Sequence, residues 1–182
     1  ADGSSASGTV GVGAAVGVNV GVLVNQARIA DGASVSSNGL SVSAVMPTAG
    51  GKNSFITTAT SGAGASNVGV AGALATNVLV NTSGASIEGD INSSGTGATV
   101  NANGGDVLVE SLNISESKVT AGASVKPATA TEPAAVGVGA SVGMNVAVNT
   151  TVAEIGNAAI VNGAKDVDLT AKGTHTLSNA AT

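Results

Sequence analysis

The side chains that could take part in acid–base catalysis are few and widely spaced in this sequence. The 182 residues include one histidine, His175, and no cysteine. A general base must be held beside a second polar group that orients it, and the sequence around His175 offers only Thr174 and Thr176. We therefore expect His175 to line the fold or to face solvent, and we expect no catalytic activity.

The acidic residues and the glycine pairs do not form a recognisable metal or cofactor site. A calcium-binding β-roll needs Gly-Gly-x-Gly-x-Asp in repetition, and only residues 103–106 approach this motif, once. Asp166 and Asp168 alternate with apolar residues, as on the soluble face of a strand. Gly11 and Gly13 have the spacing of part of a phosphate loop, but the third glycine and the following helix are missing. The sequence predicts neither a bound metal nor a cofactor.

Charge and hydropathy argue against two classes of partner. Six Lys and Arg against 11 Asp and Glu give a net charge of −5. The basic residues occur singly, whereas nucleic acid requires a clustered basic surface. The longest apolar run, Val10 to Val24, is interrupted repeatedly by glycine and is not typical of a membrane-spanning helix. We expect no nucleic acid partner and no membrane-spanning segment.

The segments that must position any functional residue show a two-residue period. Between Val10 and Val24 every even position is Val except Ala14. Two further segments, Val68 to Val80 and Val136 to Val148, alternate in a similar way. A period of two is that of a β-strand, because successive side chains point to opposite faces. With 43% apolar residues, 9% charged residues and a single aromatic, Phe55, the chain is predicted to be an internally repeated all-β protein.

The three alternating segments align without a gap over a shared motif. Each reads Asn-Val-x-Val, with Ala and Ile eight and ten positions after the Asn. From one Asn to the next, the first repeat is 77 − 19 = 58 residues long and the second is 145 − 77 = 68. We expect the ten extra residues to form a surface loop around Lys126–Pro133, where two prolines disfavour a regular strand.

The predicted organisation is one domain over residues 1–182, with repeats at approximately 8–67, 68–135 and 136–182. A repeat whose apolar face cannot be buried alone is stable only against a neighbour. Like residues then lie above like, which predicts a parallel β-solenoid (β-helix) of three repeats of roughly 58 to 68 residues. The alternative is an antiparallel β-sandwich, which would not require the motif to recur in register. In the solenoid, the segment from Val10 to Val24 either forms one wide face of a large coil or bends near Ala14 and Ala15.

The two faces of these strands carry different side chains, so we expect different environments for them. The valines are expected to stack in a dry interior, where burial of each contributes roughly 1.5 kcal/mol. The Gly and Ala of the opposite face are expected to let a second layer of chain approach closely. The repeated asparagines lie on this small-residue face, and their stacked amides are expected to hydrogen-bond in a line. The predicted structural ladder consists of Asn19, Asn77, Asn145, Ile29, Ile87 and Ile155.

The third repeat resembles the repetitive regions of very large secreted bacterial surface proteins. A strand of Gly, Ala and Val begins at Val136 and passes through Asn145 and an Ala-Glu-Ile-Gly step to a second strand at Asp166–Ala171. This order is similar to the repeats of filamentous-haemagglutinin-like exoproteins, autotransporter passengers and the fusobacterial leukotoxin type. The resemblance implies a β-helical stalk or passenger that acts in adhesion or toxicity, and it assigns no catalytic residue.

Three kinds of function are compatible with this repeat. The first is a structural segment of a secreted or cell-surface bacterial adhesin or exoprotein, acting as a rigid stalk or passenger without catalytic activity. The second is a self-assembling subunit of an extracellular fibre or sheath, which pairs end to end with other copies or with adjoining repeats of a longer chain. The third is a cytotoxin passenger or a surface-recognition solenoid for a host receptor, a glycan or ice. The residues from Ala1 onward lack the basic and apolar parts of a signal peptide, which suggests a section of a longer array or a pairing subunit.

Overall fold

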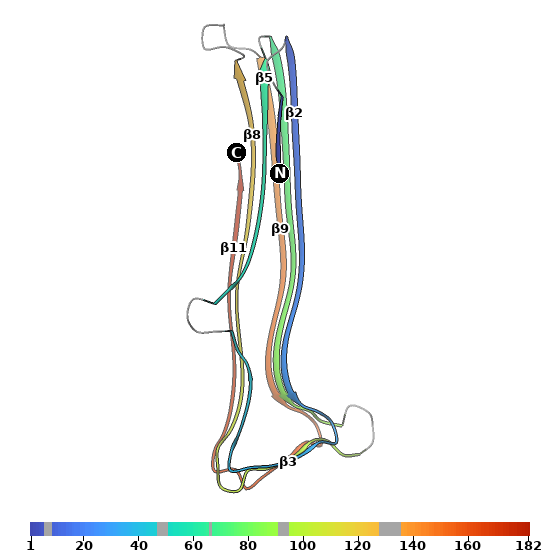
Figure 1. Cartoon of the computed structure of the whole chain (residues 1–182), viewed down its shortest axis with the longest axis vertical. Coiled ribbons are helices and arrows are strands. Elements are labelled where there is room, and N and C mark those ends of the chain that lie inside the picture. Colours follow the sequence, from blue (N-terminus) through green and yellow to red (C-terminus); the bar gives the residue numbers. More distant parts are fainter. Residues whose placement is uncertain (6–8, 47–50, 66, 91–94, 128–135) are drawn as a thin grey trace.

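The structure is a computed structural model of the chain, and it describes residues 1–5, 9–46, 51–65, 67–90, 95–127 and 136–182. Every regular element among these residues is a β-strand (Figure 1). The strands are β1 (Asp2–Ser5), β2 (Val10–Ile29), β3 (Ser34–Ser36), β4 (Leu40–Ala44), β5 (Asn53–Ala65), β6 (Val68–Ile87), β7 (Thr99–Asn101), β8 (Val107–Pro127), β9 (Val136–Ile155), β10 (Ile160–Asn162) and β11 (Val167–Ala181). The predicted all-β class is confirmed.

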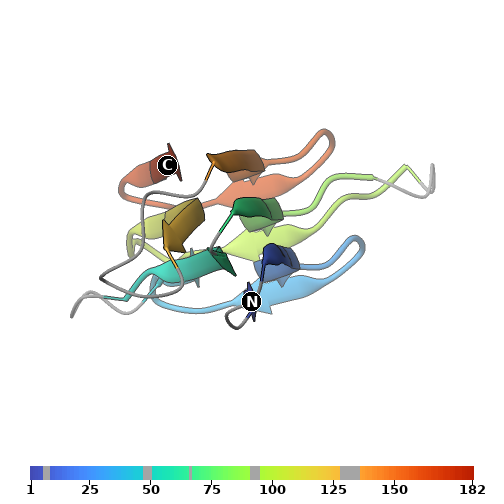
Figure 2. The ribbon, with the colours of Figure 1, turned by 90° about the horizontal axis from the view of Figure 1, so that it is seen from above.

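The chain forms three wide coils of the same design. In the first coil β2 runs the length of the molecule, β3 crosses at one end, and β4 and β5 return along the other side (Figure 1). The second coil repeats this path with β6, β7 and β8, and the third repeats it with β9, β10 and β11. Seen from above, the coils are layered one over another (Figure 2).

All pairs between strands are parallel and join one coil to the next. The outgoing strands form a sheet in the order β2-β6-β9, and the short crossing strands form a second in the order β10-β7-β3. The returning strands form the third sheet, β1-β5-β8-β11, in which β4 also pairs with β8. The parallel β-solenoid is therefore confirmed, and the antiparallel sandwich is not the fold.

The register agrees with the alignment of the repeats. Over 20 residues Val10, Val68 and Val136 begin aligned strands, and the pairing continues without a slip to the aligned isoleucines. Because side chains alternate between faces, a slip of one residue would move every side chain of a strand to the opposite face. The same parity therefore faces the same way in all three coils.

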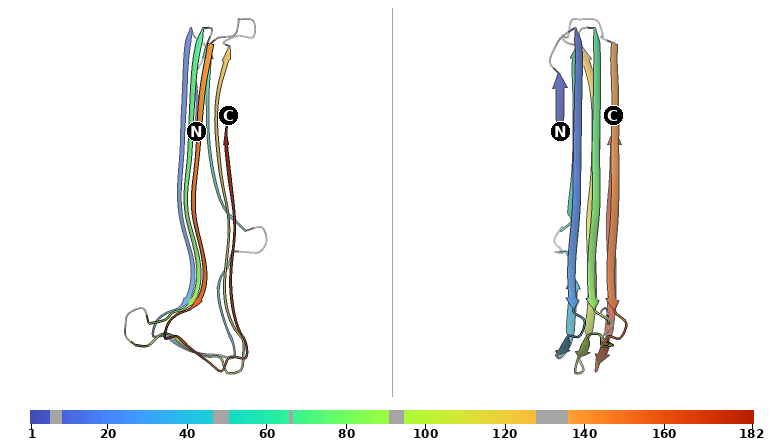
Figure 3. Two further views of the ribbon diagram at one scale, coloured as in Figure 1. Left: turned by 180° about the vertical axis from the view of Figure 1, so that it is seen from behind. Right: turned by 90° about the vertical axis from the view of Figure 1, so that its right-hand side faces the viewer.

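The outgoing strands each form one wide face and do not divide into smaller turns. β2, β6 and β9 are 20 residues each, which at about 3.3 Å per residue gives about 65 Å. Most strands in globular proteins are three to ten residues long. Figure 3 shows the three strands running alongside one another over this length. Of the two layouts considered from the sequence, the large coil is the one observed.

The extra residues of the second repeat do not all enter where the prolines suggested. From Ile87 to Thr99 the chain takes 99 − 87 = 12 steps, whereas the aligned path from Ile29 to Ser34 takes 34 − 29 = 5. Seven added residues therefore enter at this corner. Of the loop expected around Lys126–Pro133, residues 126 and 127 belong to β8, and residues 128–135 lie outside the described residues.

The alternating valines of the outgoing strands do not line the interior, contrary to the expectation from hydrophobicity. Val20 is 66% exposed and Val146 is 45% exposed, although they stack in register with Val78. The inner rows carry the opposite parity, which consists of Gly, Ala, Asn, Ser and a few larger residues. The two long sheets approach so closely that a Cβ added to Gly13 would lie 2.1 Å from the Gly62 carbonyl oxygen. The expectation that the small residues admit a second layer is confirmed, and this second layer is the returning sheet.

The core therefore consists mostly of small side chains, with two clusters of buried apolar residues. One cluster fills the corner where the crossing strands meet the long sheets, and it includes Ile87, Val100 and Val109. The other lies between the long sheets and consists mainly of alanines around Val119. Dense packing at short separation takes the place of large side chains in this interior.

Candidate functional site: a polar interior and an apolar outer face

A row of hydrogen bonds connects the two long sheets through the interior. The Asn77 amide of β6 donates to the Phe55 carbonyl oxygen at 3.2 Å and also to the Ser117 hydroxyl. Ser117 of β8 donates in turn to Asn145 Oδ1 at 2.6 Å, and the Asn145 amide donates to the Ser117 carbonyl oxygen at 3.0 Å. Ser117 thus bridges the asparagines of two neighbouring coils.

The asparagines of the predicted ladder stack in register, but Asn77 bonds across the interior. Asn19, Asn77 and Asn145 occupy the same position of β2, β6 and β9. Asn77 Oδ1 is buried without a hydrogen-bond partner, so the Asn77 carbonyl accepts no bond from a stacked amide. The isoleucines of the ladder also stack, with Ile87 fully buried and Ile29 and Ile155 packed against its cluster. Direct amide stacking is replaced by bonds to the returning sheet, because the sheets lie within reach of each other.

Further polar contacts of the same kind continue along β6 and β8. Asn81 donates to Asn113 Oδ1 at 2.7 Å, and the Ser111 hydroxyl donates to Ser83 at 3.0 Å. Each pair joins an outgoing strand to the returning strand opposite. Buried polar groups need such partners, because an unsatisfied group costs about 1–3 kcal/mol. These bonds fix the two sheets relative to each other.

The serines of β8 were missed by the sequence reasoning, although a signal for them exists. In β8 the inward positions include Ser111, Asn113, Ser115 and Ser117, all buried. The charged residues of the same strand, Glu110, Glu116, Lys118 and Lys126, all have the opposite parity. A row of small uncharged residues alternating with charged ones predicts which face is buried even when that row is polar.

His175 lies in β11 and contacts a buried serine. Its Nδ1 lies 2.8 Å from Ser115 Oγ. The same hydroxyl donates a hydrogen bond to Asn149 Oδ1 at 3.1 Å. A serine–histidine pair is a familiar nucleophile arrangement. Ser115 is only 3% exposed, so a substrate carbonyl cannot reach its oxygen. The pair links the second coil to the third, and His175 lies in the inner row of β11 while its side chain remains exposed to solvent.

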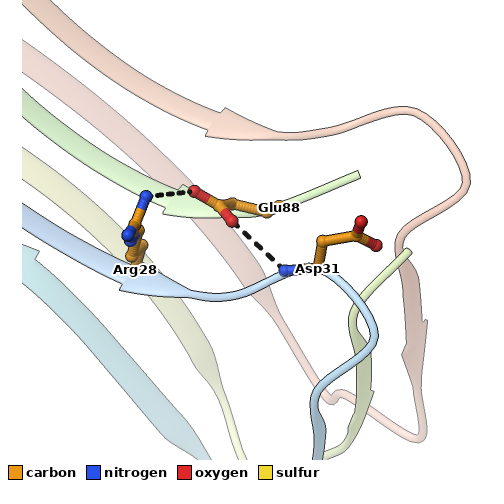
Figure 4. Close-up of polar contacts among 3 residues, drawn as sticks. All are labelled: Arg28, Asp31 and Glu88. Atoms are coloured by element: carbon orange, nitrogen blue, oxygen red, sulfur yellow. Dashed lines mark hydrogen bonds and ion pairs between the residues drawn. The ribbon is translucent and has the colours of Figure 1, made fainter. Parts of the chain in front are cut away.

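Charged residues lie at a corner and on the outside. The Glu88 carboxylate accepts a bond from Arg28 Nη1 at 3.2 Å and one from the backbone N–H of Asp31 at 3.2 Å, joining the first coil to the second (Figure 4). Beside it a depression of about 260 Å³ opens over Gly84. Within the described part of the chain, no three His, Cys, Asp or Glu side chains come close enough to hold a metal ion.

One surface ion pair connects the residue just before β5 to β8 of the neighbouring coil. The Lys52 ammonium hydrogen-bonds to the Glu116 carboxylate. This hydrogen bond, together with the positive charge of Lys52, holds the pKa of Glu116 below its ordinary value of 4.5. Both side chains are partly exposed to solvent, so the pair contributes little to stability.

The outward side chains of β2, β6 and β9 form a continuous apolar surface, the valine face. We define it by columns, each a set of three residues aligned across the three strands. The columns are Val10/Val68/Val136, Val12/Val70/Val138, Ala14/Gly72/Ala140, Val16/Leu74/Val142, Val18/Thr76/Met144, Val20/Val78/Val146 and Val22/Val80/Val148. Most of these side chains are exposed. This face, and no cavity, is the most distinctive surface feature among the described residues.

Comparisons with known proteins identify no relative for this arrangement. No protein-family model, curated protein or solved structure matches the chain. The described residues include no helix long and apolar enough to cross a membrane. Fold and surface are therefore the only grounds for a functional proposal.

Proposed function

We propose that this chain is a structural β-solenoid segment of a secreted or cell-surface bacterial protein, and that it has no catalytic activity. The observation that carries the proposal is the register, which places like residues above like through 20 residues of three outgoing strands. Catalysis requires different groups converging on one point. A stack of equivalent rows is suited instead to extending a rigid body by one coil at a time.

The width of the coils bears on which structural role is favoured. One coil takes 58 to 68 residues and advances the stack by only about 4.8 Å, the separation of neighbouring strands. A thin stalk is served better by narrow coils, which give more length per residue. Wide coils give area, so they favour a passenger or wall-like element that presents a broad surface over a spacer that only provides distance.

The location can be tested directly on intact cells. Antibodies raised against the folded chain should label intact cells of the source organism, or detect the protein in the culture medium. Labelling that appears only after lysis would contradict the proposal. A cytoplasmic protein of known location, probed in the same cells, controls for leakage.

A second candidate function, end-to-end assembly, is favoured by the two outer coils. β2 and β9 are the outer strands of their sheet, so one row of backbone N–H and C=O groups on each faces away from the stack. On β11 the inward-facing Leu177 is 52% exposed, whereas Ser117 beneath it in the second coil is buried. A further coil, from a longer chain or from another copy, would cover this surface.

End-to-end assembly can be tested with a matched pair of variants. Leu177→Lys places a charge where a further coil would stack, whereas Thr176→Lys places it on the outer face beside Glu116. If copies stack through their ends, sedimentation velocity at rising concentration should show assembly for the unmodified chain and for Thr176→Lys. Open-ended growth should be lost for Leu177→Lys, because an unpaired charge would be buried. Equal behaviour of both variants would exclude this contact.

A further inference from the structure

We propose that the valine face is an interface between two copies of this chain, which pack face to face with their outgoing strands antiparallel. This lateral contact is distinct from stacking through the coil ends, because it uses side chains that point away from the solenoid. Val12 and Val22 are 65% and 70% exposed, so the face is open to such a partner. Stacking further coils would leave it uncovered.

The area of the valine face is sufficient for a specific dimer. Seven columns span 13 residues at about 3.3 Å each, and three strands lie about 4.8 Å apart, so the face measures roughly 40 by 14 Å, or about 600 Å². Two such faces bury about 1,200 Å², the lower limit for standard interfaces. On a typical monomer the largest apolar patch is about 300–600 Å², so the valine face lies at the upper end of this range. Each additional coil in an array would enlarge the interface further.

The charge distribution fits an apolar partner with the same surface. The seven columns contain Val, Leu, Met, Ala, Gly and one Thr, and the first charged side chains along these strands are Arg28 and Glu154, beyond the face. An uncharged face gives nothing for a charged partner to recognise. A second valine face matches it, because two uncharged sheets pack at about 10 Å with side chains interdigitating.

The shape of the corner selects the antiparallel orientation. Beyond the end of β2 the chain swings to the outer side before it turns back into β3, as Figure 1 shows. In a parallel arrangement two such corners would meet and hold the sheets apart. In the antiparallel arrangement each corner lies past the other copy's Val10 end, so the valine faces can close.

The same orientation matches small columns to large ones. With all seven columns overlapping, the central column Val16/Leu74/Val142 faces itself. The column of Ala14, Gly72 and Ala140 then faces the column of Val18, Thr76 and Met144 of the second copy. The trough left by the small residues is thus filled by larger side chains, as close packing requires.

The interface can be tested by the mass of the unmodified chain and of two matched variants. Val20→Glu places a charge in the valine face, and Ile56→Glu places one on the outer face of the returning sheet beside Lys118. Val20 and Ile56 are similarly exposed, at 66% and 59%. Once end contacts are blocked by Leu177→Lys in every chain, sedimentation equilibrium should give twice the 16.9 kDa monomer mass for the otherwise unmodified chain and for Ile56→Glu. Val20→Glu should raise the dissociation constant at least tenfold, because a carboxylate would be buried without a partner.

The outcomes distinguish this interface from other occupants of the face. If Leu177→Lys abolishes association and Val20→Glu does not, copies meet only through their ends and the lateral interface is excluded. A chain that stays monomeric and co-sediments with phosphatidylcholine vesicles would assign the face to a lipid surface. A chain that stays monomeric without binding vesicles would also overturn the proposal.

The orientation can be tested with single cysteines, because the chain contains none. Leu74 and Val68 of β6 are 38% and 40% exposed. In the antiparallel dimer the two copies of Leu74 face each other, whereas the two copies of Val68 are offset by 12 residues, about 40 Å. A thiol cross-linker of about 10 Å reach should join Leu74→Cys but not Val68→Cys. Cross-linking of both would require parallel strands, contrary to the proposal.

Discussion

At the scale of single residues, the inward glycines determine how closely the two long sheets approach. A Cβ added to Gly13 would overlap the Gly62 backbone across the interior, and one added to Gly21 would overlap the Phe55 ring. Outward glycines such as Gly72 meet no atom within 4 Å of an added Cβ. Glycine is therefore required at these inward positions of the sheet, whereas the outward positions have room for a side chain.

This difference predicts unequal effects for two Gly-to-Ala substitutions. Gly13→Ala should lower the free energy of unfolding by about 1–3 kcal/mol, because the methyl group would overlap the Gly62 backbone and force the sheets apart. Gly72→Ala should leave stability unchanged or raise it by up to about 1 kcal/mol, since it restricts the unfolded chain without a clash. Urea unfolding of both variants measures the difference. An equal loss of unfolding free energy in both variants would show that the two sheets do not approach as closely as described.

At the scale of elements, side-chain hydrogen bonds attach each outgoing strand to the returning strand opposite. Strands within one sheet are joined by their backbones, but nothing in the backbone ladder connects β6 to β8. Ser117 supplies such a connection, because its hydroxyl contacts both Asn77 and Asn145. Alanine-rich packing alone would fix the distance between sheets but not their relative position along the strands.

Removal of this hydroxyl should therefore be costly. Ser117→Ala leaves Asn145 Oδ1 without its 2.6 Å donor, and we expect a loss of about 1–3 kcal/mol in the free energy of unfolding. Ser43→Ala is the control, because Ser43 is exposed and bonds only to the exposed Ser41 in the described contacts. Its effect should stay within about 0.5 kcal/mol. If both variants unfold at the same temperature, Ser117 does not join the sheets as described.

At the scale of the whole molecule, stability is expected to depend on the number of coils. The fully buried large side chains, Leu79, Ile87, Val100, Val107, Val109 and Val119, all belong to the second coil. In the third coil the inner row of β11 is exposed, and in the first coil the inner row of β2 is at most partly buried from Gly17 onward. Energetically this is the behaviour of a repeat array, in which each interface between neighbours stabilises both.

A coil can therefore be duplicated to raise stability. A tandem copy of residues 68–135 should form a fourth coil in register, because Val68 and Val136 occupy equivalent positions. The four-coil chain should unfold at higher denaturant concentration and with a steeper dependence, since it exposes more surface on unfolding. Deletion of residues 68–135 should have the opposite effect. If duplication lowers the denaturant concentration at the unfolding midpoint, successive coils do not stack as equivalent repeats.

Much of the architecture was predictable from the sequence because it depends on local and repeated features. Two-residue alternation identifies strands, and the recurring Asn-Val-x-Val motif aligns Asn19, Asn77 and Asn145 without reference to any contact. Parallel stacking follows, since equivalent strands of successive repeats place like above like. The internal partners of Asn77 and Asn145 could not be derived in this way, because they lie on a different strand of the coil.

Only the tertiary structure decided which face of each strand is buried. β2 presents an apolar row of valines and an uncharged row of Gly, Ala and Asn, and hydrophobicity alone favours burial of the valines. The returning strand reverses this preference. The charged residues of β8 must lie on its outer face, so Ser111, Asn113 and Ser117 point inward. Small polar side chains pack and hydrogen-bond best against a row of glycine, alanine and asparagine. The alternation is a property of one strand, whereas the choice between its faces belongs to the pair of sheets.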